Sequence, residues 1–215
     1  MLFNVIHYTE LKERIPILQK MASREGVALN IIEKFDAESI PEEIIARIDT
    51  KKISISEASC FLKHIEVYKT LVADMDSEYS IIIEDDVVFN KNITSDLKKL
   101  ISKLPIDYDL FFFGESKINF RVPFYKKNLF KKTNEPTSWG GNGVTRTLDS
   151  YIISKKCAEL IVEEYENLEK LNDAIDAWIN ILARKHEFNG YWLKHTLTAN
   201  NEKFESSLES TRWYD

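Results

Sequence analysis

The stretch IIIEDDVVF, residues 81–89, predicts where the fold is centred, because three acidic residues follow directly on a run of β-branched ones. Residues 81–83 have the composition of a buried strand. Burying an unpaired charge is costly, so we expect Glu84, Asp85 and Asp86 where this strand leaves the core. In open α/β sheets, ligands bind at the carboxyl ends of strands, and clustered carboxylates there suit Mg²⁺ or Mn²⁺ with a phosphorylated substrate. An ordinary acidic turn is the alternative, because aspartate is a common turn residue.

The composition indicates one compact domain over residues 1–215. Of these residues 44% are hydrophobic and 12% aromatic, which is enough for one sizeable core and too little for two. The 35 acidic residues outnumber the 29 basic ones, and the net charge is −6. A protein with this balance lacks the positive field that nucleic acids require, so we expect no nucleic-acid partner.

Neither an export signal nor a membrane span is visible in the sequence. Residues 1–8, MLFNVIHY, lack the basic lead and the long apolar run of a signal peptide. No segment approaches the roughly 18 apolar residues of a transmembrane helix. We therefore expect a soluble, cytoplasmic protein. Cys60 and Cys157 fall at core-like positions of helical patterns, so we expect free, buried thiols.

Alternating strand and helix patterns predict an α/β fold. A strand over 3–8, a helix ending at Gly26 with Pro16 in its first turn, and a strand over 29–35 form a right-handed βαβ unit. Ser54 to Glu57 has the pattern of a capping box, which begins a helix with an apolar stripe. Residues 38–53 are expected to be irregular. The remaining predicted elements are strands over 79–88, 109–113, 151–153 and 188–193, and helices over 95–103, after Ser154 and after Asp173.

Four stretches match the patterns of a known family, in the same order along the chain. SEASCFLKH (56–64) is similar to a Gly-Glu-x-x-Cys-x-x-Ser-His helix start, with Ser56 in place of the glycine, and EDDV (84–87) matches Glu-Asp-Asp-Val. YIISKKCA (151–158) is similar to Gly-Tyr-x-x-Ser-x-x-Gly-Ala, and IDAWI (175–179) to Val-Asp-x-x-Leu. The chain thereby resembles glycosyltransferase family 25, which contains bacterial lipooligosaccharide galactosyltransferases and collagen hydroxylysine galactosyltransferases.

The resemblance implies both a fold and a reaction. The fold would be a Rossmann-like α/β domain of GT-A type, with a mixed, mostly parallel central sheet flanked by helices. The reaction would be an inverting, metal-dependent transfer of a hexose, galactose or glucose, from a UDP-sugar to a glycan or hydroxylated acceptor, with Mn²⁺ or Mg²⁺ as cofactor. Two alternatives stay open: a two-metal phosphoryl-transfer enzyme, which would need further carboxylates, and a degenerate member that only binds glycans.

The resemblance and the chemistry of the side chains together suggest the metal-binding and catalytic residues. We expect Asp86 to bind the metal directly, and Glu84 to act at the donor sugar or at a metal-bound water. An inverting transfer needs a base for the acceptor hydroxyl, and Asp176 is our candidate. Asp173 and then Asp149 are the fallbacks. The alternative for Asp176 is a purely structural role, because the helix dipole favours an acid in a first turn.

Five further residues are candidate contacts of the nucleotide or its diphosphate: Arg14, Asp36, Glu57, Asp85 and His195. Each has an ordinary structural alternative, for example a turn for Asp36 or helix capping for Glu57. His64 is expected to be a satisfied, buried histidine rather than a metal ligand.

A long loop is predicted between the two halves of the chain. Residues 117–132 contain six basic and four aromatic residues and no acid, and residues 139–143 read WGGNG. Long loops within compact domains are often functional, and glycines allow hinge motion. We expect residues 115–146 to include a lid or acceptor-binding segment that orders over the donor.

Overall fold

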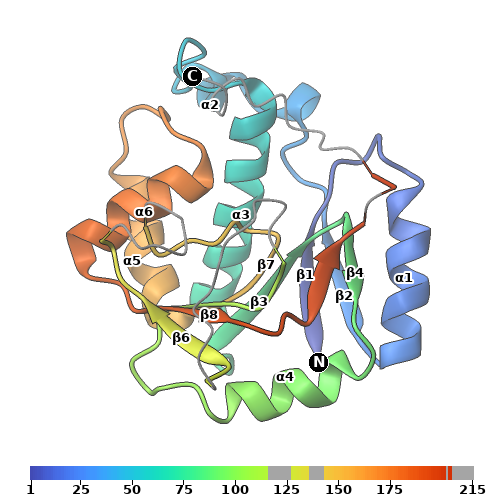
Figure 1. Ribbon diagram of the computed structural model, residues 1–215. Helices are drawn as coiled ribbons and strands as arrows, with labels where there is room; N and C mark the ends of the chain where they lie inside the picture. The colour runs from blue at the N-terminus through green and yellow to red at the C-terminus, as the bar shows by residue number, and fades with distance from the viewer. Residues whose placement is uncertain (116–126, 136–142, 202, 205–215) are drawn as a thin grey trace.

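A seven-stranded mixed sheet is the centre of the computed structural model, which describes residues 1–115, 127–135, 143–201 and 203–204 (Figure 1). The strand order is β2-β1-β3-β7-β5-β8-β6. The strands are β1 (Leu2–Ile6), β2 (Ala28–Ile32), β3 (Tyr79–Glu84), β5 (Leu110–Phe112), β6 (Leu129–Lys132), β7 (Ser150–Ser154) and β8 (Gly190–Leu193). The pairs β1–β2, β1–β3 and β5–β8 are parallel, and β7 is antiparallel to both β3 and β5, so five strands share one direction. The expected mixed, mostly parallel sheet is confirmed.

The first βαβ unit forms as predicted, with one difference at its end. Helix α1 (Arg14–Glu25) connects β1 to β2, carries Pro16 in its first turn and ends at Gly26, which has the left-handed φ of 66°. The second strand stops at Ile32 rather than at Phe35. Phe35 has a φ of 69°, which an extended strand does not allow.

Two groups of helices cover the two faces of the sheet. Helices α3 (Ile55–Ala73), α5 (Lys155–Glu166) and α6 (Ile175–His186) pack on one face, and α1 and α4 (Ile93–Ile101) on the other. Because side chains alternate along a strand, Ile82 packs beneath the first group, whereas Ile81 and Ile83 pack beneath the second. The central strand is therefore apolar on both faces, as a covered strand must be.

Serine caps define two of these helices as predicted, but a third begins differently. Ser54 and Glu57 form the expected capping box at α3, and the Ser154 hydroxyl accepts from the Cys157 amide at the start of α5. Asp173 does not cap α6. The cap position is Ala174, which offers no side-chain oxygen, so the helix starts one residue later than predicted.

The acidic stretch divides the predicted central strand into two strands, β3 and β4. The chain turns at residues 85–86, and β4 (Val87–Phe89) pairs antiparallel with β9 (Thr198–Asn200) in a second sheet. The expected continuous strand over 79–88 is wrong, because the acids form a turn instead of crossing the sheet. Residues 38–53 also contain short helices that the sequence did not indicate, namely η1 (Ala37–Ser39) and α2 (Glu42–Ile45).

The predicted long loop is only partly described. Strand β6 falls within residues 117–132, and Lys132 is buried at its end, so this part is not a loop. Residues 116–126 and 136–142, which include most of the glycine-rich stretch and the expected lid, lie outside the described residues.

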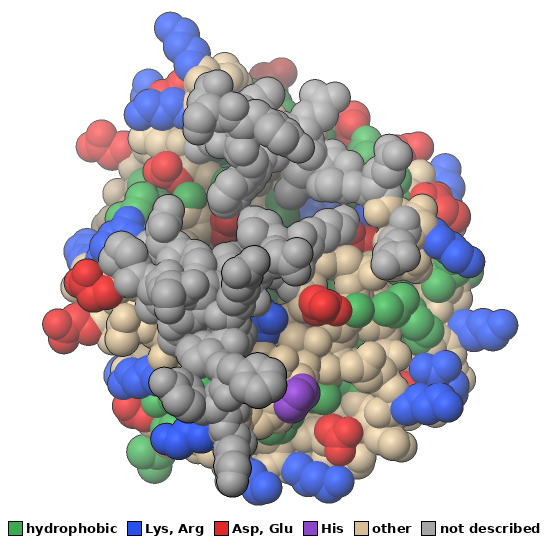
Figure 2. All heavy atoms as spheres, viewed as in Figure 1, with side chains coloured by type: hydrophobic (Ala, Val, Ile, Leu, Met, Phe, Trp, Pro, Cys, Tyr) green, Lys and Arg blue, Asp and Glu red, His purple; other side chains and the backbone are tan. Residues whose placement is uncertain are grey.

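Charges of both signs are mixed over the visible face, where Lys and Arg alternate with Asp and Glu around the rim (Figure 2). This agrees with the similar numbers of acidic and basic residues, 35 and 29. Among the described helices, none has the length and apolar character needed to cross a membrane.

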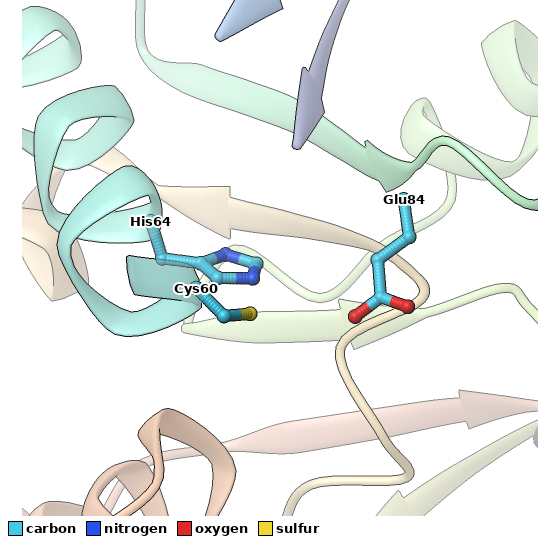
Figure 3. A group of neighbouring side chains, drawn as sticks. All are labelled: Cys60, His64 and Glu84. Carbon is cyan, nitrogen blue, oxygen red and sulfur yellow. The ribbon is translucent and has the colours of Figure 1, made fainter. Parts of the chain in front are cut away.

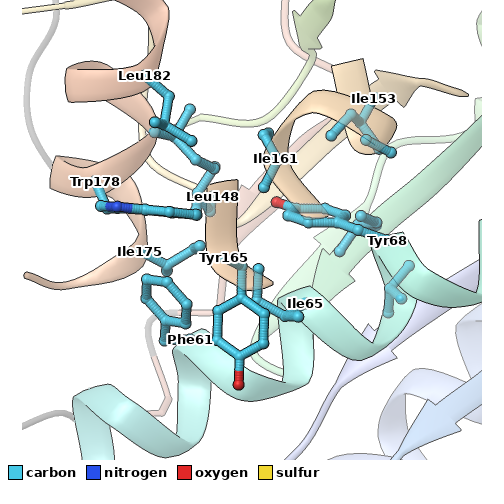
Figure 4. Close-up of a cluster of buried hydrophobic side chains, with 14 of the residues drawn as sticks. Phe61, Ile65, Tyr68, Leu148, Ile153, Ile161, Tyr165, Ile175, Trp178 and Leu182 are labelled. Atoms are coloured by element: carbon cyan, nitrogen blue, oxygen red, sulfur yellow. The ribbon is translucent and has the colours of Figure 1, made fainter. Parts of the chain in front are cut away.

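We expect Phe61→Ala to destabilise the protein by about 3–5 kcal/mol, because Phe61 is the centre of the aromatic core under α3. Its ring is fully buried, 5.0 Å from the Trp178 ring and 6.0 Å from the Tyr165 ring between centroids (Figure 4). Urea unfolding measures the effect. Ile106→Ala, at a fully exposed position, is the control and should change stability by less than about 0.5 kcal/mol. Equal effects of the two substitutions would contradict this description of the core.

Candidate functional site

The acid turn, which we define as Glu84, Asp85 and Asp86, lies at the carboxyl end of β3, where the sequence places it. Its backbone is held from two distant parts of the chain. The Glu84 amide donates to the Asp149 carbonyl at 2.8 Å, and the Asn201 amide donates to the Asp86 carbonyl at 2.7 Å. Asp85 and Asp86 are buried, whereas Glu84 is partly exposed. The three carboxylates therefore face different surroundings.

Asp85 is paired with groups at the ends of β1 and α1. Its carboxylate accepts from Arg14 Nη1 at 2.7 Å and contacts His7 Nδ1 at 2.6 Å. The structure thus brings together two of the proposed nucleotide contacts, Arg14 and Asp85. The Arg14 guanidinium also lies under the Phe204 ring, 5.2 Å from its centroid. Each oxygen of this buried carboxylate therefore has a partner, and one of the two partners is the Arg14 guanidinium.

Asp36 belongs to the same buried network. Its carboxylate accepts hydrogen bonds from the Lys63 ammonium and from the Thr9 amide and hydroxyl, and Lys63 also donates to the His7 carbonyl. Burial by itself would raise the pKa of Asp36, but the Lys63 and Thr9 hydrogen bonds outweigh it and hold the pKa below its ordinary value of 3.8. Neither His7 nor Lys63 was singled out from the sequence, because only the fold places them beside these acids.

Asp149 brings a further carboxylate to the other side of the acid turn. Its pKa is raised to about 6, chiefly by burial and further by the negative charge of Asp86, although Thr147 and Arg146 oppose the shift. Asp149 Oδ2 is buried without a hydrogen-bond partner among the described residues. A side chain at Gly114 would overlap this carboxylate, so only glycine fits there. Thr147, whose hydroxyl donates to Asp149, has a φ of 112°, a strained backbone of the kind found at functional sites.

Arg146 is a buried cation that sequence reasoning missed. It donates from Nη1 to the Leu193 carbonyl at 2.6 Å, and its guanidinium lies 5.7 Å from the Trp192 ring centroid. Burial lowers the pKa of Arg146, while the charge of Asp149 raises it. The only sign of it in the sequence is that it stands three positions before Asp149, one of the candidate bases.

Glu84 faces two side chains of α3. One ligand atom each from Cys60, His64 and Glu84 lie within 4.8 Å of one another (Figure 3). His64 Nδ1 bonds the Tyr151 hydroxyl at 2.7 Å, but its Nε2 is buried without a partner among the described residues. Burial lowers the pKa of His64 to about 3, so the ring is neutral. His64 is therefore buried as expected, but of its two ring nitrogens only Nδ1 has a hydrogen-bond partner among the described residues.

Asp176 lies in the first turn of α6 and is partly buried, and its Oδ1 accepts from the Ala177 amide at 2.8 Å. Burial raises the pKa of the Cys60 thiol, and the charges of Glu84 and then Asp176 raise it further. Asp173, the first fallback base, is partly exposed in the link before the helix.

The two other predicted contacts lie apart from these interactions. The Glu57 carboxylate accepts from the Ser54 amide at 2.7 Å in the capping box. His195 is exposed in the link between β8 and β9, and its amide donates to Asn128 Oδ1 at 2.9 Å. The capping role of Glu57 is thus present, and no described interaction joins His195 to the acid turn.

The fold is an α/β domain whose mixed central sheet is flanked by helices and carries the acid turn at the end of its central strand. Residues 4–179 match the family described as "Glycosyltransferase family 25 (LPS biosynthesis protein)", and the chain belongs to that family. The matched range includes α3, the acid turn, Asp149 and Asp176. The resemblance of the four sequence stretches is therefore confirmed.

Individual relatives are distant. Procollagen galactosyltransferase 2 of Mus musculus is 31% identical over 77 residues, which are 34% of this chain and 12% of the mouse protein. The Homo sapiens protein of that name is 22% identical over 134 residues, 55% of this chain and 21% of the human one. The chain thus spans about a fifth or less of the length of these curated relatives.

Solved structures resemble the chain in fold. S. aureus TarS 1-349 gives a TM-score of 0.53 at 14% identity, covering 93% of this chain and 60% of that one. A glycosyltransferase involved in the glycosylation of the major capsid of PBCV-1 gives a TM-score of 0.47 at 11% identity, and the match covers 93% of this chain and 92% of that one. At such identities, the likeness to TarS supports the fold alone.

We expect Asp36→Asn to destabilise the protein by about 3–5 kcal/mol at neutral pH, because it leaves the buried Lys63 ammonium without its carboxylate. The folded pKa of Asp36 is lowered, so its contribution is present above pH 3.8 and is lost as the pH falls through the folded pKa. The difference between variant and wild type should therefore shrink in acid. Urea unfolding at several pH values measures it.

Glu66→Gln is the matched control, because Glu66 pairs with Lys34 at 2.8 Å on the surface. Such exposed pairs contribute about 0–1 kcal/mol. If Asp36→Asn costs no more than this control, the buried network does not stabilise the end of β1.

Proposed function

We propose that this chain is an inverting, metal-dependent glycosyltransferase that moves a hexose from a UDP-sugar to a glycan or hydroxylated acceptor. The observation that carries the proposal is the convergence of Glu84, Asp86 and Asp149 at the carboxyl end of the central strand of a family 25 chain. Galactose is the preferred hexose, because the curated relatives are named galactosyltransferases. Glucose is the second choice.

The residues around Asp86 fit a divalent cation. Carboxylate oxygens are the ligands that Mn²⁺ and Mg²⁺ prefer, and Asp86 is buried beside a second carboxylate, Asp149, whose raised pKa reflects burial and the Asp86 charge. We assign Asp86 as the direct ligand, with Glu84 at the donor sugar or a metal-bound water. When bound, the cation would neutralise charge on the departing diphosphate.

The buried network beside the acid turn would hold in place the part of the site where the nucleotide binds. Asp36 and Asp85 already accept strong hydrogen bonds from Lys63 and Arg14, so we assign them to fix the ends of β1 and α1 rather than to act as free acceptors. Arg14 holds Asp85, which lies between Glu84 and Asp86 in the sequence. This arrangement would keep the acid turn rigid while substrate exchanges.

Two further residues retain their expected roles as proposals. Glu57 would contact the nucleotide from the start of α3, although its carboxylate also completes the capping box. His195 would reach the diphosphate from the link after β8, where its exposed side chain is unrestrained by its backbone bond to Asn128.

Asp176 is the base that we propose for the acceptor hydroxyl. It is more exposed than Asp149, so an acceptor entering the site could reach it. The pKa of Asp149, about 6, suits a base at neutral pH, but its carboxylate is enclosed against Gly114. We therefore assign Asp149 to position the acid turn, and Asp173 remains the fallback base.

Donor hydrolysis tests the reaction class. Release of UDP from UDP-galactose or UDP-glucose in the presence of Mn²⁺ would support sugar transfer, and comparison of the two donors identifies the hexose. Release of phosphate from phosphate esters without sugar transfer would instead support a phosphoryl-transfer enzyme. Absence of both reactions, with glycan binding retained, would support a degenerate member.

We expect UDP to stabilise the wild-type protein only when Mn²⁺ or Mg²⁺ is present, and Asp86→Asn to lose that gain. A ligand that binds only the native state at a hundred times its Kd adds about 2.7 kcal/mol. Thermal unfolding with UDP, with and without metal, measures the effect. Asp96→Asn, an exposed acid on α4, is the control and should behave as wild type. An unchanged metal-dependent shift in Asp86→Asn would place the metal elsewhere.

We expect Asp176→Asn to lower the transfer rate by roughly 10²-fold or more under saturating donor and metal, because proton removal by a base contributes in the transition state. UDP affinity should stay within a few-fold of wild type, and radiolabel transfer to acceptor measures the rate. Asp173→Asn tests the fallback base, three residues away, and should transfer at close to the wild-type rate. Near-normal transfer by Asp176→Asn would remove it from the mechanism, and loss of UDP binding would make its role structural.

A further inference from the structure

Cys60, His64 and Glu84 form a cluster whose donor atoms differ in kind from those at Asp86. Cys60 and His64 lie one turn apart on α3, so both side chains leave the same face of the helix, and Glu84 approaches from the end of β3. Their three ligand atoms lie within 4.8 Å of one another (Figure 3). A thiol, an imidazole and a carboxylate are the three side-chain types that bind zinc.

His64 is oriented for a ligand. Its Nδ1 bonds the Tyr151 hydroxyl at 2.7 Å, and that hydroxyl is held in turn by Tyr68 at 2.6 Å. Such a bond at one ring nitrogen fixes the direction in which the other nitrogen points. His64 is fully buried, and its Nε2 has no hydrogen-bond partner among the described residues. Figure 3 shows the ring directed toward the Cys60 sulfur and the Glu84 carboxylate.

We propose that Cys60, His64 and Glu84 form a binding site for a thiophilic divalent cation, Zn²⁺. Zinc bonds of about 2.0–2.3 Å place tetrahedral ligand atoms about 3.5 Å apart, so the three atoms, now within 4.8 Å of one another, need only small shifts to bind the ion. Cys60 binds as the thiolate, and its proton passes to solvent. Three protein ligands leave a fourth position for water. Sulfur discriminates against Mg²⁺ and Mn²⁺, which prefer oxygen.

The site has a regulatory consequence that rests on the proposed function. Glu84 is also the residue that we place at the donor sugar or at a metal-bound water. Zinc binding would hold its carboxylate beside Cys60 and His64, so sugar transfer should fall as the zinc site fills. Removal of zinc by dialysis into buffer that contains only Mn²⁺ should restore it.

Titration of the metal-stripped full chain with Zn²⁺ tests the site by calorimetry. We expect one Zn²⁺ per chain, and Cys60→Ser should weaken its binding by at least about 100-fold, the upper end of the loss caused by removing an outer-shell partner. Cys157→Ser is the matched control, because Cys157 is the other free cysteine and lies buried on α5. It should bind zinc as wild type does. Equal affinity in Cys60→Ser, or no stoichiometric binding by wild type, would overturn the proposal.

Two additional measurements separate this site from the proposed catalytic one. Co²⁺ in place of Zn²⁺ should give a thiolate-to-cobalt absorption band in wild type and Asp86→Asn but not in Cys60→Ser. Asp86→Asn should keep zinc affinity while it loses metal-dependent UDP binding. A cobalt band that survives in Cys60→Ser would overturn the zinc site. A normal zinc site in a protein without sugar transfer would overturn only the proposed function.

Discussion

The compensation of negative charge at the end of β3 is the constraint on which the rest of the structure depends. Three consecutive acids follow a strand that is apolar on both faces, and two of them are buried. The fold resolves this by turning the chain, so that Asp85 meets Arg14 and His7 on one side while Asp86 and Asp149 share the other. The protein supplies Arg14 and His7 as partners of Asp85, whereas on the other side the charge of Asp86 raises the pKa of Asp149 against the opposing charge of Arg146.

The two sides of the acid turn therefore have different surroundings. On one side, a continuous network of buried ion pairs and hydrogen bonds joins Asp36, Lys63, His7, Asp85 and Arg14. A buried network of this kind is weak evidence for stability but can specify a single arrangement of the groups it joins. Asp149 shows the opposite condition, with a raised pKa, an enclosed carboxylate and a strained neighbour in Thr147. Strained backbone and shifted pKa values of this kind are common at functional sites.

Glu84 connects the proposed catalytic site to α3. As the last residue of β3, it pairs in register with Ile6 on one neighbouring strand, and its amide is held by the Asp149 carbonyl. Its backbone is thus fixed from two sides, while its side chain lies beside Cys60 and His64. Oxygen ligands suit Mn²⁺ or Mg²⁺ and a thiolate suits Zn²⁺, so under the two proposals the identity of the bound cation would decide how Glu84 is used.

The sequence by itself determined the βαβ order, the two serine-capped helices, the mixed sheet, the family and the position of the acids at a strand end. Each depends on neighbours along the chain, through side-chain periodicity, capping or a short motif. Tertiary structure alone decided the β4–β9 pairing, the Lys63–Asp36 ion pair, the enclosure of Asp149 against Gly114 and the meeting of His64 with Glu84. These contacts join residues that are far apart in sequence or on different elements. Their distances depend on how strands and helices pack, which no local pattern records.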